Sequence, residues 1–98
     1  MSNESSFDWD DAKANGNYRK HGVSFDMATR VFEDHFALQR LDALSGEYGE
    51  DRIIMTGMAR GQLLTIVYVE RGEIIRIISA RAASKGEHDD YYRQNSQE

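Results

Sequence analysis

The spacing of polar and apolar residues predicts two helices in the first third of the chain. Alternation over residues 6–9 is typical of a short edge strand. Asp10 can then cap a helix of residues 11–21, and Gly22 stands where a left-handed residue ends such a helix. Ser24 is expected to cap a second helix, which has an apolar face and should stop near residue 34.

The following segments have the pattern of strands. Residues 36–41 alternate, and apolar runs cover residues 52–57, 63–69 and 74–82. Residues 58–61 are predicted to connect two of these strands as a hairpin. Ser84 and Glu87 then have the spacing of a capping box, which predicts a last helix.

The order β-α-α-β-β-β-β-α predicts an α+β fold in a single domain over residues 1–98. We expect an antiparallel β-sheet with two N-terminal helices and one C-terminal helix, the helices covering a face of the sheet. Residues 1–5 and 95–98 are expected to be flexible, because they carry little that could pack.

Composition narrows the function classes. The chain has no cysteine, which excludes disulfides, thiolate nucleophiles and cysteine-based zinc sites. No apolar run approaches the roughly 20 residues that span a bilayer, and the N-terminus lacks the features of a signal peptide. We therefore expect a cytoplasmic protein without membrane contact. The three histidines are too scattered for metal-ligand spacing, so no metal and no cofactor are predicted.

The net charge of −5 argues at first against a nucleic-acid partner. The charge is unevenly distributed, however. The acidic excess falls in residues 1–12, in the glycine-containing loop 42–51 and in residues 85–98, whereas residues 13–41 and 52–84 carry ten bases and five acids. A local basic surface is therefore possible, with the acidic segments facing away from it.

Two segments hold candidate chemistry. On the first helix Lys13, Asn17 and Lys20 or His21 line up at helical spacing, either as a solvated face or as a phosphate-binding and proton-transferring group. In the last strand, the sequence Arg76-Ile-Ile-Ser-Ala-Arg81 is predicted to put Ser79 and Arg81 on one face and Arg76 on the other. Arg81 needs either a carboxylate such as Glu87 or a phosphate, and both remain open.

Weaker candidates lie elsewhere. Arg52 begins a strand and Arg60 lies in the hairpin, where exposed arginines are common. Tyr91 and Tyr92 near the end of the last helix could either pack or stack on bases.

Taken together, two blocks of the sequence resemble the BrnT family of toxins from type II toxin–antitoxin systems. The resemblance covers about residues 7–92 and is carried by Phe7-Asp8-Trp9-Asp10, Lys13-Ala14, Asn17, Arg19-Lys20-His21-Gly22-Val23-Ser24-Phe25, Ala28, Val31-Phe32, Arg76-Ile77-Ile78-Ser79-Ala80-Arg81-Ala82, Glu87 and Tyr91. It implies a RelE-like fold and a ribonuclease that cleaves RNA and inhibits translation. It also implies a BrnA-like antitoxin with a ribbon-helix-helix domain, through which the complex would bind DNA and repress its own operon.

Metal-free RNA cleavage needs a base, an acid and cations that stabilise the phosphorane. On this hypothesis His21 is the base or acid, Arg81 and Lys20 stabilise phosphate, and Arg52 and Arg76 are weaker candidates for that role. Glu87 or Tyr91 would orient a group or supply a proton. The RNA-binding set adds five residues: Lys13, Asn17, Arg52, Arg60 and Ser79.

The alternative is a catalytically weak or inactive relative that acts as an antitoxin-binding module. The acidic composition favours this reading, and Lys20-His21 with Ser79–Arg81 favour catalysis. Crowding of His21 and Arg81 by Asp10, Glu47 or Asp89 would support the module.

Overall fold

The computed structural model describes residues 6–43 and 50–96 and confirms the α+β class. The first five residues and the middle of the 42–51 loop, both discussed above, lie outside these ranges. The elements, in chain order, are β1 (Ser6–Asp8), α1 (Asp11–His21), α2 (Phe25–Ala28), the 3-10 helix η1 (Thr29–Glu33), β2 (Leu38–Leu41), β3 (Ile53–Ala59), β4 (Gln62–Arg71), β5 (Ile74–Ala82) and α3 (Lys85–Asn95).

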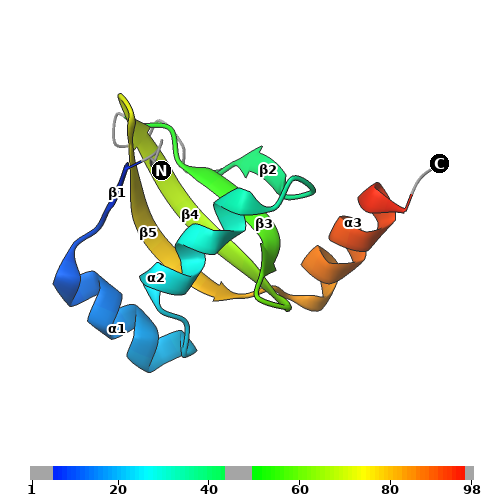
Figure 1. Ribbon diagram of the computed structural model, residues 1–98, viewed down its shortest axis with the longest axis horizontal. Helices are drawn as coiled ribbons and strands as arrows, with labels where there is room; N and C mark the ends of the chain where they lie inside the picture. Colours follow the sequence, from blue (N-terminus) through cyan, green and yellow to red (C-terminus); the bar gives the residue numbers. More distant parts are fainter. Residues whose placement is uncertain (1–5, 44–49, 97–98) are drawn as a thin grey trace.

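The sheet has five strands in the order β1-β5-β4-β3-β2 and is mixed (Figure 1). Strands β2 to β5 pair antiparallel, whereas β1 runs parallel to β5 from Ser6 opposite Ile74 to Asp8 opposite Arg76. The prediction of a purely antiparallel sheet is therefore wrong at this edge. A parallel partner needs a long crossover, and here α1, α2 and three strands intervene between β1 and β5.

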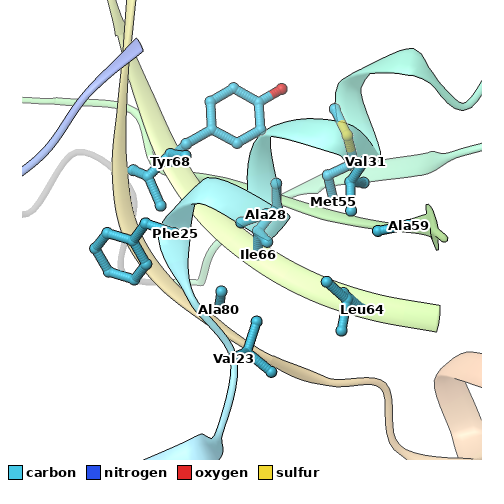
Figure 2. Close-up of a cluster of buried hydrophobic side chains, with 11 residues drawn as sticks. Val23, Phe25, Ala28, Val31, Met55, Ala59, Leu64, Ile66, Tyr68 and Ala80 are labelled. Carbon is cyan, nitrogen blue, oxygen red and sulfur yellow. The ribbon is translucent and has the colours of Figure 1, made fainter. Parts of the chain in front are cut away.

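The core lies between α2, η1 and one face of the sheet, which we call the core face (Figure 2). Phe25, Ala28 and Val31 from the helical segment pack with Ile66 and Tyr68 of β4, all at most 2% exposed. Figure 1 shows α2 crossing in front of β4 and β5. The other side of the sheet is called the opposite face below.

The second helix differs from its prediction. Ser24 caps it as expected, accepting a hydrogen bond from Met27 N, but the α-helix ends at Ala28 and continues as η1. η1 lies directly on β3 at Gly57, where an added Cβ would come within 2.8 Å of Val31 Cγ1. The strand glycine therefore permits this close approach of helix and sheet.

The turn between β3 and β4 is shorter than predicted. Strand β3 continues to Ala59, so Arg60 and Gly61 are the two central residues of the hairpin. Their φ angles of +51° and +81° match the type I′ turn that joins twisted strands tightly.

A β-bulge interrupts β5. Val67 of β4 pairs with Ser79, but the next residue, Tyr68, pairs with Ile77, so Ile78 is an extra residue in β5. A bulge of one residue shifts the alternation of side chains between the two faces by one position.

The bulge changes which residues of β5 share a face. Ile77 and Ala80 both contribute to the core cluster, although they are three positions apart. Arg76, Ser79 and Arg81 accordingly all lie on the opposite face. The prediction that Arg76 faces away from Ser79 and Arg81 is wrong, because it assumed uninterrupted alternation.

Candidate functional site

Arg81 and Glu87 form an ion pair with fork-to-fork geometry at the junction of β5 and α3. Arg81 Nη1 donates to Glu87 Oε1 at 2.8 Å, and Nη2 donates to Oε2 at 2.9 Å. The pair sits where β5 turns into α3, because Ser84 caps α3 and the Glu87 side chain completes the capping box. Of the two partners left open for Arg81 by the sequence, the structure shows the carboxylate.

Glu87 is surrounded by further donors. Thr65 Oγ1 donates to Glu87 Oε1 at 2.8 Å, as does Ser84 N at 2.8 Å, and Arg40 Nη2 lies 3.7 Å from Oε2. The hydrogen bond from Arg81, then those from Ser84 and Thr65, outweigh burial and lower the pKa of Glu87 to about 2. Glu87 is thus a permanent anion near neutral pH and suits orienting Arg81 rather than transferring a proton.

Arg81 retains the capacity to bind an anion. Its contacts with Glu87 and with the Ala82 carbonyl oxygen use three of the five N–H donors of a guanidinium. Its side chain is 41% exposed, and that of Arg40 on the other side of Glu87 is 61% exposed. Two arginines around one carboxylate leave a net positive charge, which favours a phosphate at this place.

Tyr91 is occupied by a different carboxylate. Its hydroxyl donates to Asp34 Oδ2 at 2.6 Å, while Met58 N and Phe36 N also donate to Asp34. Burial and then the bond to Asp34 raise the pKa of Tyr91 to about 12. Burial alone would raise the pKa of Asp34, but the hydrogen bonds that Asp34 accepts from Tyr91, Met58 and Phe36 outweigh burial and lower this pKa. Tyr91 therefore suits anchoring α3 better than exchanging protons with RNA.

Three residues of α3 at positions i, i+4 and i+8 connect it to the rest of the fold. Glu87 binds Arg81 and Thr65, Tyr91 binds Asp34, and Asn95 Nδ2 donates to the Phe36 carbonyl oxygen at 3.1 Å. We call Glu87, Tyr91 and Asn95 the anchor stripe. The flexibility expected for residues 95–98 stays a prediction, and residues 97–98 lie outside the described residues. Tyr91 and Tyr92 lie in the body of α3 rather than near its end.

Asn17 completes the edge of β5. Its side-chain Nδ2 donates to the carbonyl oxygens of Ala80 at 2.8 Å and Val23 at 3.0 Å, and Ala80 N donates to Asn17 Oδ1 at 3.2 Å. The pairing of β1 with β5 ends at Arg76, so the Asn17 amide takes the place of a strand farther along β5. Asn17 is engaged with the backbone, and its predicted RNA contact has no support from this geometry.

The other candidates on α1 are exposed. Lys13, Lys20 and His21 are all exposed, the last two in the final turn of the helix. Figure 1 shows α1 and α3 toward opposite ends of the longest axis, with the carboxyl end of β5 between them. The structure therefore does not bring α1, which carries His21, together with α3, which carries Tyr91.

The remaining predicted arginines are held by acids or lie at a turn. Arg76 Nη1 is 3.3 Å from Asp8 Oδ2, and Arg52 Nε is 3.3 Å from Asp42 Oδ2. Arg60 occupies the hairpin turn between β3 and β4, and Ser79 is half-buried on the opposite face.

Not all acidic residues of the end segments and the loop face away from the candidate RNA site. Asp8 contacts Arg76, and Asp42 contacts Arg52. The expectation that the acidic segments face away from this surface is wrong for Asp8 and Asp42. Outside the candidate set, Arg71 Nε lies 2.7 Å from Glu50 Oε2.

The acids predicted to mark an inactive protein are placed elsewhere. Asp10 caps the N-terminus of α1, at the other end of the helix from His21, and Asp89 pairs with Lys85. Glu47 lies outside the described residues.

A groove of about 410 Å³ adjoins the ion pair on the opposite face, between β2, β3 and α3. Its walls include Leu38, Arg40, Ile54, Thr56, Glu87 and Asp90. The sequence reasoning missed Arg40, Thr65 and Asp34. For Arg40 a signal existed, because it alternates with Leu38 in a predicted strand and so shares its face.

Within residues 6–43 and 50–96, no three histidine, aspartate or glutamate side chains gather as metal ligands would. Over the same ranges, no helix is long and apolar enough to cross a membrane.

The chain was compared with known protein families. A family model described as "Ribonuclease toxin, BrnT, of type II toxin-antitoxin system" matches residues 9–87. A search of curated proteins found no match.

Proposed function

The chain belongs to the BrnT family of ribonuclease toxins of type II toxin–antitoxin systems, and from this we propose that it cleaves RNA at the Arg81–Glu87 site. The observation that carries this placement is the arginine pair around Glu87. Arg81 is fixed in orientation yet 41% exposed, and Arg40 adds a second cation beside it on the same face. We further propose a RelE-like ribonuclease that acts without a metal ion and inhibits translation in the cytoplasm.

Arg81 would stabilise the charge that builds on the phosphorane. An arginine held by a carboxylate keeps its fork preorganised, so no reorganisation is needed during the reaction. Removing one such preorganised donor costs on the order of 100-fold in rate in other enzymes. Arg40 lies within reach of the same carboxylate and would bind an adjacent phosphate.

Proton transfer is assigned to His21. Glu87 remains ionised and Tyr91 remains protonated near neutral pH, as their pKa values of about 2 and about 12 imply. Histidine is the side-chain type suited to acid–base work at this pH. The Asn17–Ala80 contact holds α1 against β5 one residue before Arg81, so RNA lying across the end of β5 would meet both α1 and α3.

The test is cleavage of a single-stranded RNA by purified protein, free of antitoxin, with EDTA present. We expect Arg81→Lys, which keeps the charge but loses the fork, and His21→Ala each to lower the rate about 100-fold. Arg19→Ala, an exposed arginine in the same turn of α1 as His21, is the matched control and should cleave normally. Normal cleavage by both Arg81→Lys and His21→Ala would contradict the assignment, as would loss of all activity in EDTA.

The proposed partner is a BrnA-like antitoxin with a ribbon-helix-helix domain, which binds operator DNA and carries the toxin to it. Expression of this chain alone should arrest bacterial growth, and coexpression of the neighbouring antitoxin gene should relieve the arrest. In a gel-shift assay the operator should bind the complex but not the toxin by itself.

A second function is favoured by the ion pairs at Arg52, Arg71, Arg76 and Arg81, whose carboxylate partners would compete with RNA. On this reading the chain is an antitoxin-binding module without ribonuclease activity. It would bind the antitoxin with no growth arrest and no RNA cleavage by the wild-type protein.

A further inference from the structure

Two threonines lie buried behind the ion pair. Thr56 of β3 and Thr65 of β4 are cross-strand partners on the opposite face, 7% and 2% exposed. Their hydroxyl oxygens are 2.8 Å apart, and Thr65 Oγ1 lies 2.8 Å from Glu87 Oε1. Thr65 is also the cross-strand partner of Arg81, so Glu87 bridges the side chains of two paired residues.

The protons in this chain of hydroxyls have one direction. Glu87 is ionised near neutral pH and can only accept hydrogen bonds. A threonine hydroxyl has a single proton, and that of Thr65 is used toward Glu87. Thr65 must therefore accept from Thr56, and the order of donation is Thr56 to Thr65 to Glu87.

A purely apolar pair would have served the sheet equally well. Valine has nearly the shape of threonine and an equal preference for strands, and it would avoid burying two hydroxyls. The remaining donors to Glu87 Oε1, from Arg81 and Ser84, belong to the same short stretch of chain as Glu87. Thr65 instead ties the carboxylate to the centre of the sheet.

We propose that Thr56 and Thr65 are positioning residues, whose directed hydroxyl chain fixes the Glu87 carboxylate and, through it, the guanidinium of Arg81 against the scissile phosphate. This inference rests on the proposed RNA cleavage. The hydroxyl of Thr65 acts directly on Glu87, and that of Thr56 acts by holding the Thr65 hydroxyl in the donating orientation. Loss of Thr65 should therefore have the larger effect.

The test compares Thr65→Val with Thr65→Ser. Valine keeps the packing and removes the hydroxyl, whereas serine keeps the hydroxyl and removes a buried methyl group. We expect Thr65→Val to lower kcat about 10-fold with KM little changed, because the transition-state contact of Arg81 is misaligned. Thr65→Ser should stay within about twofold of the wild type, because it keeps the hydroxyl that donates to Glu87.

A merely structural role would lower only the folded fraction, so kcat per folded molecule, measured well below the unfolding transition, would then match the wild type in both variants. Thr56→Val should show a weaker form of the Thr65→Val effect. Thr29→Val, whose hydroxyl bonds the Asp26 carbonyl oxygen away from the site, should cleave like the wild type. Equal activity of Thr65→Val and the wild type, or greater activity of Thr65→Val than of Thr65→Ser, would overturn the proposal.

A second measurement does not depend on catalysis. Carboxyl NMR of labelled Glu87 should show its pKa moving up from about 2 in Thr65→Val and staying near that value in Thr65→Ser. If the wild type cleaves no RNA while the pKa shifts as expected, the proposed function fails and the hydroxyl chain to Glu87 stands. An unshifted pKa in Thr65→Val overturns the chain whatever the activity.

Discussion

Arg81 and Glu87 face each other with both nitrogen–oxygen distances below 3 Å, at 2.8 and 2.9 Å, so the last strand and the last helix are locked together at their junction. Because Glu87 is only 14% exposed in its side chain, this ion pair is weakly screened by water. Its strength has consequences for stability that depend on pH.

Glu87 should make the fold sensitive to acid. Its pKa is lowered from 4.5 to about 2, so its ionised form stabilises the folded state above pH 4.5, and this contribution is lost as the pH falls toward 2. The shift corresponds to roughly 3 kcal/mol. Urea unfolding of Glu87→Gln should show a deficit at pH 7 that shrinks steadily below pH 4.5. Asp89→Asn, which removes an exposed carboxylate of the same helix, serves as control; an equal deficit of Glu87→Gln at pH 7 and pH 2.5 would contradict this account.

Tyr91→Phe should lower stability without changing the pH profile of cleavage. The hydroxyl donates to the charged Asp34, and a hydrogen bond to a charged group contributes about 1.5–3 kcal/mol. Its pKa of about 12 keeps it protonated throughout the assay range. Urea unfolding and a pH–rate profile from pH 5 to 9 measure the two effects. Tyr92→Phe, which removes the hydroxyl of a half-exposed side chain, is the control. If the basic or acidic side of the pH–rate profile shifted in Tyr91→Phe, Tyr91 would again be a candidate for proton transfer.

The bulge at Ile78 can be tested by disulfide formation. The chain has no cysteine, so an introduced pair forms a single defined bond. Val67 and Ser79 are cross-strand partners on the opposite face, within the Cα separation that a disulfide needs. We expect Val67→Cys with Ser79→Cys to oxidise readily, seen as a mobility shift and by mass spectrometry. If instead the pair Val67→Cys and Ile78→Cys formed the disulfide, Val67 would be paired with Ile78, and β5 would have no bulge at this position.

Asn17→Ala should destabilise the protein, although α1 has no buried residue and substitutions on such a helix usually cost little. Three hydrogen bonds are lost, and the Ala80 N–H and C=O lose their partner, which costs about 2–3 kcal/mol in total. Hydrogen exchange at the Ala80 amide should accelerate in parallel. Asn15→Ala, an exposed asparagine of the same helix, is the control. Unchanged stability together with weakened RNA binding would return Asn17 to the RNA-binding set.

Local signals were enough to predict much of this fold. The Ser84 and Glu87 capping box, the Asp10 cap and the left-handed Gly22 are all present as predicted, because each depends on residues within one turn of helix. The same capping box fixes Glu87 in the first turn of α3, next to the end of β5, and this placement makes its ion pair with Arg81 predictable.

Non-local relationships were not predictable in this way. The parallel pairing of β1 with β5 joins segments almost seventy positions apart, and nothing in either segment specifies the direction of its partner. The bulge is one extra residue in an apolar run, where isoleucine fits either face. The alternation of β2 gives the face on which Arg40 lies, but its approach to Glu87 also depends on α3 lying over that face, which no local pattern of the sequence specifies.

The anchor stripe gives α3 an unusual kind of attachment. Within the described part of the chain, Tyr91 is the one buried side chain of this helix, and the contacts that hold it are mostly ionic or hydrogen-bonded. Apolar attachment weakens on cooling and survives acid, whereas this attachment weakens with acid and is less affected by cold. α3 should therefore detach from Arg81 and open as one local unfolding unit, ahead of the sheet, and the amides of α3 should exchange faster than those of β4 as the pH is lowered.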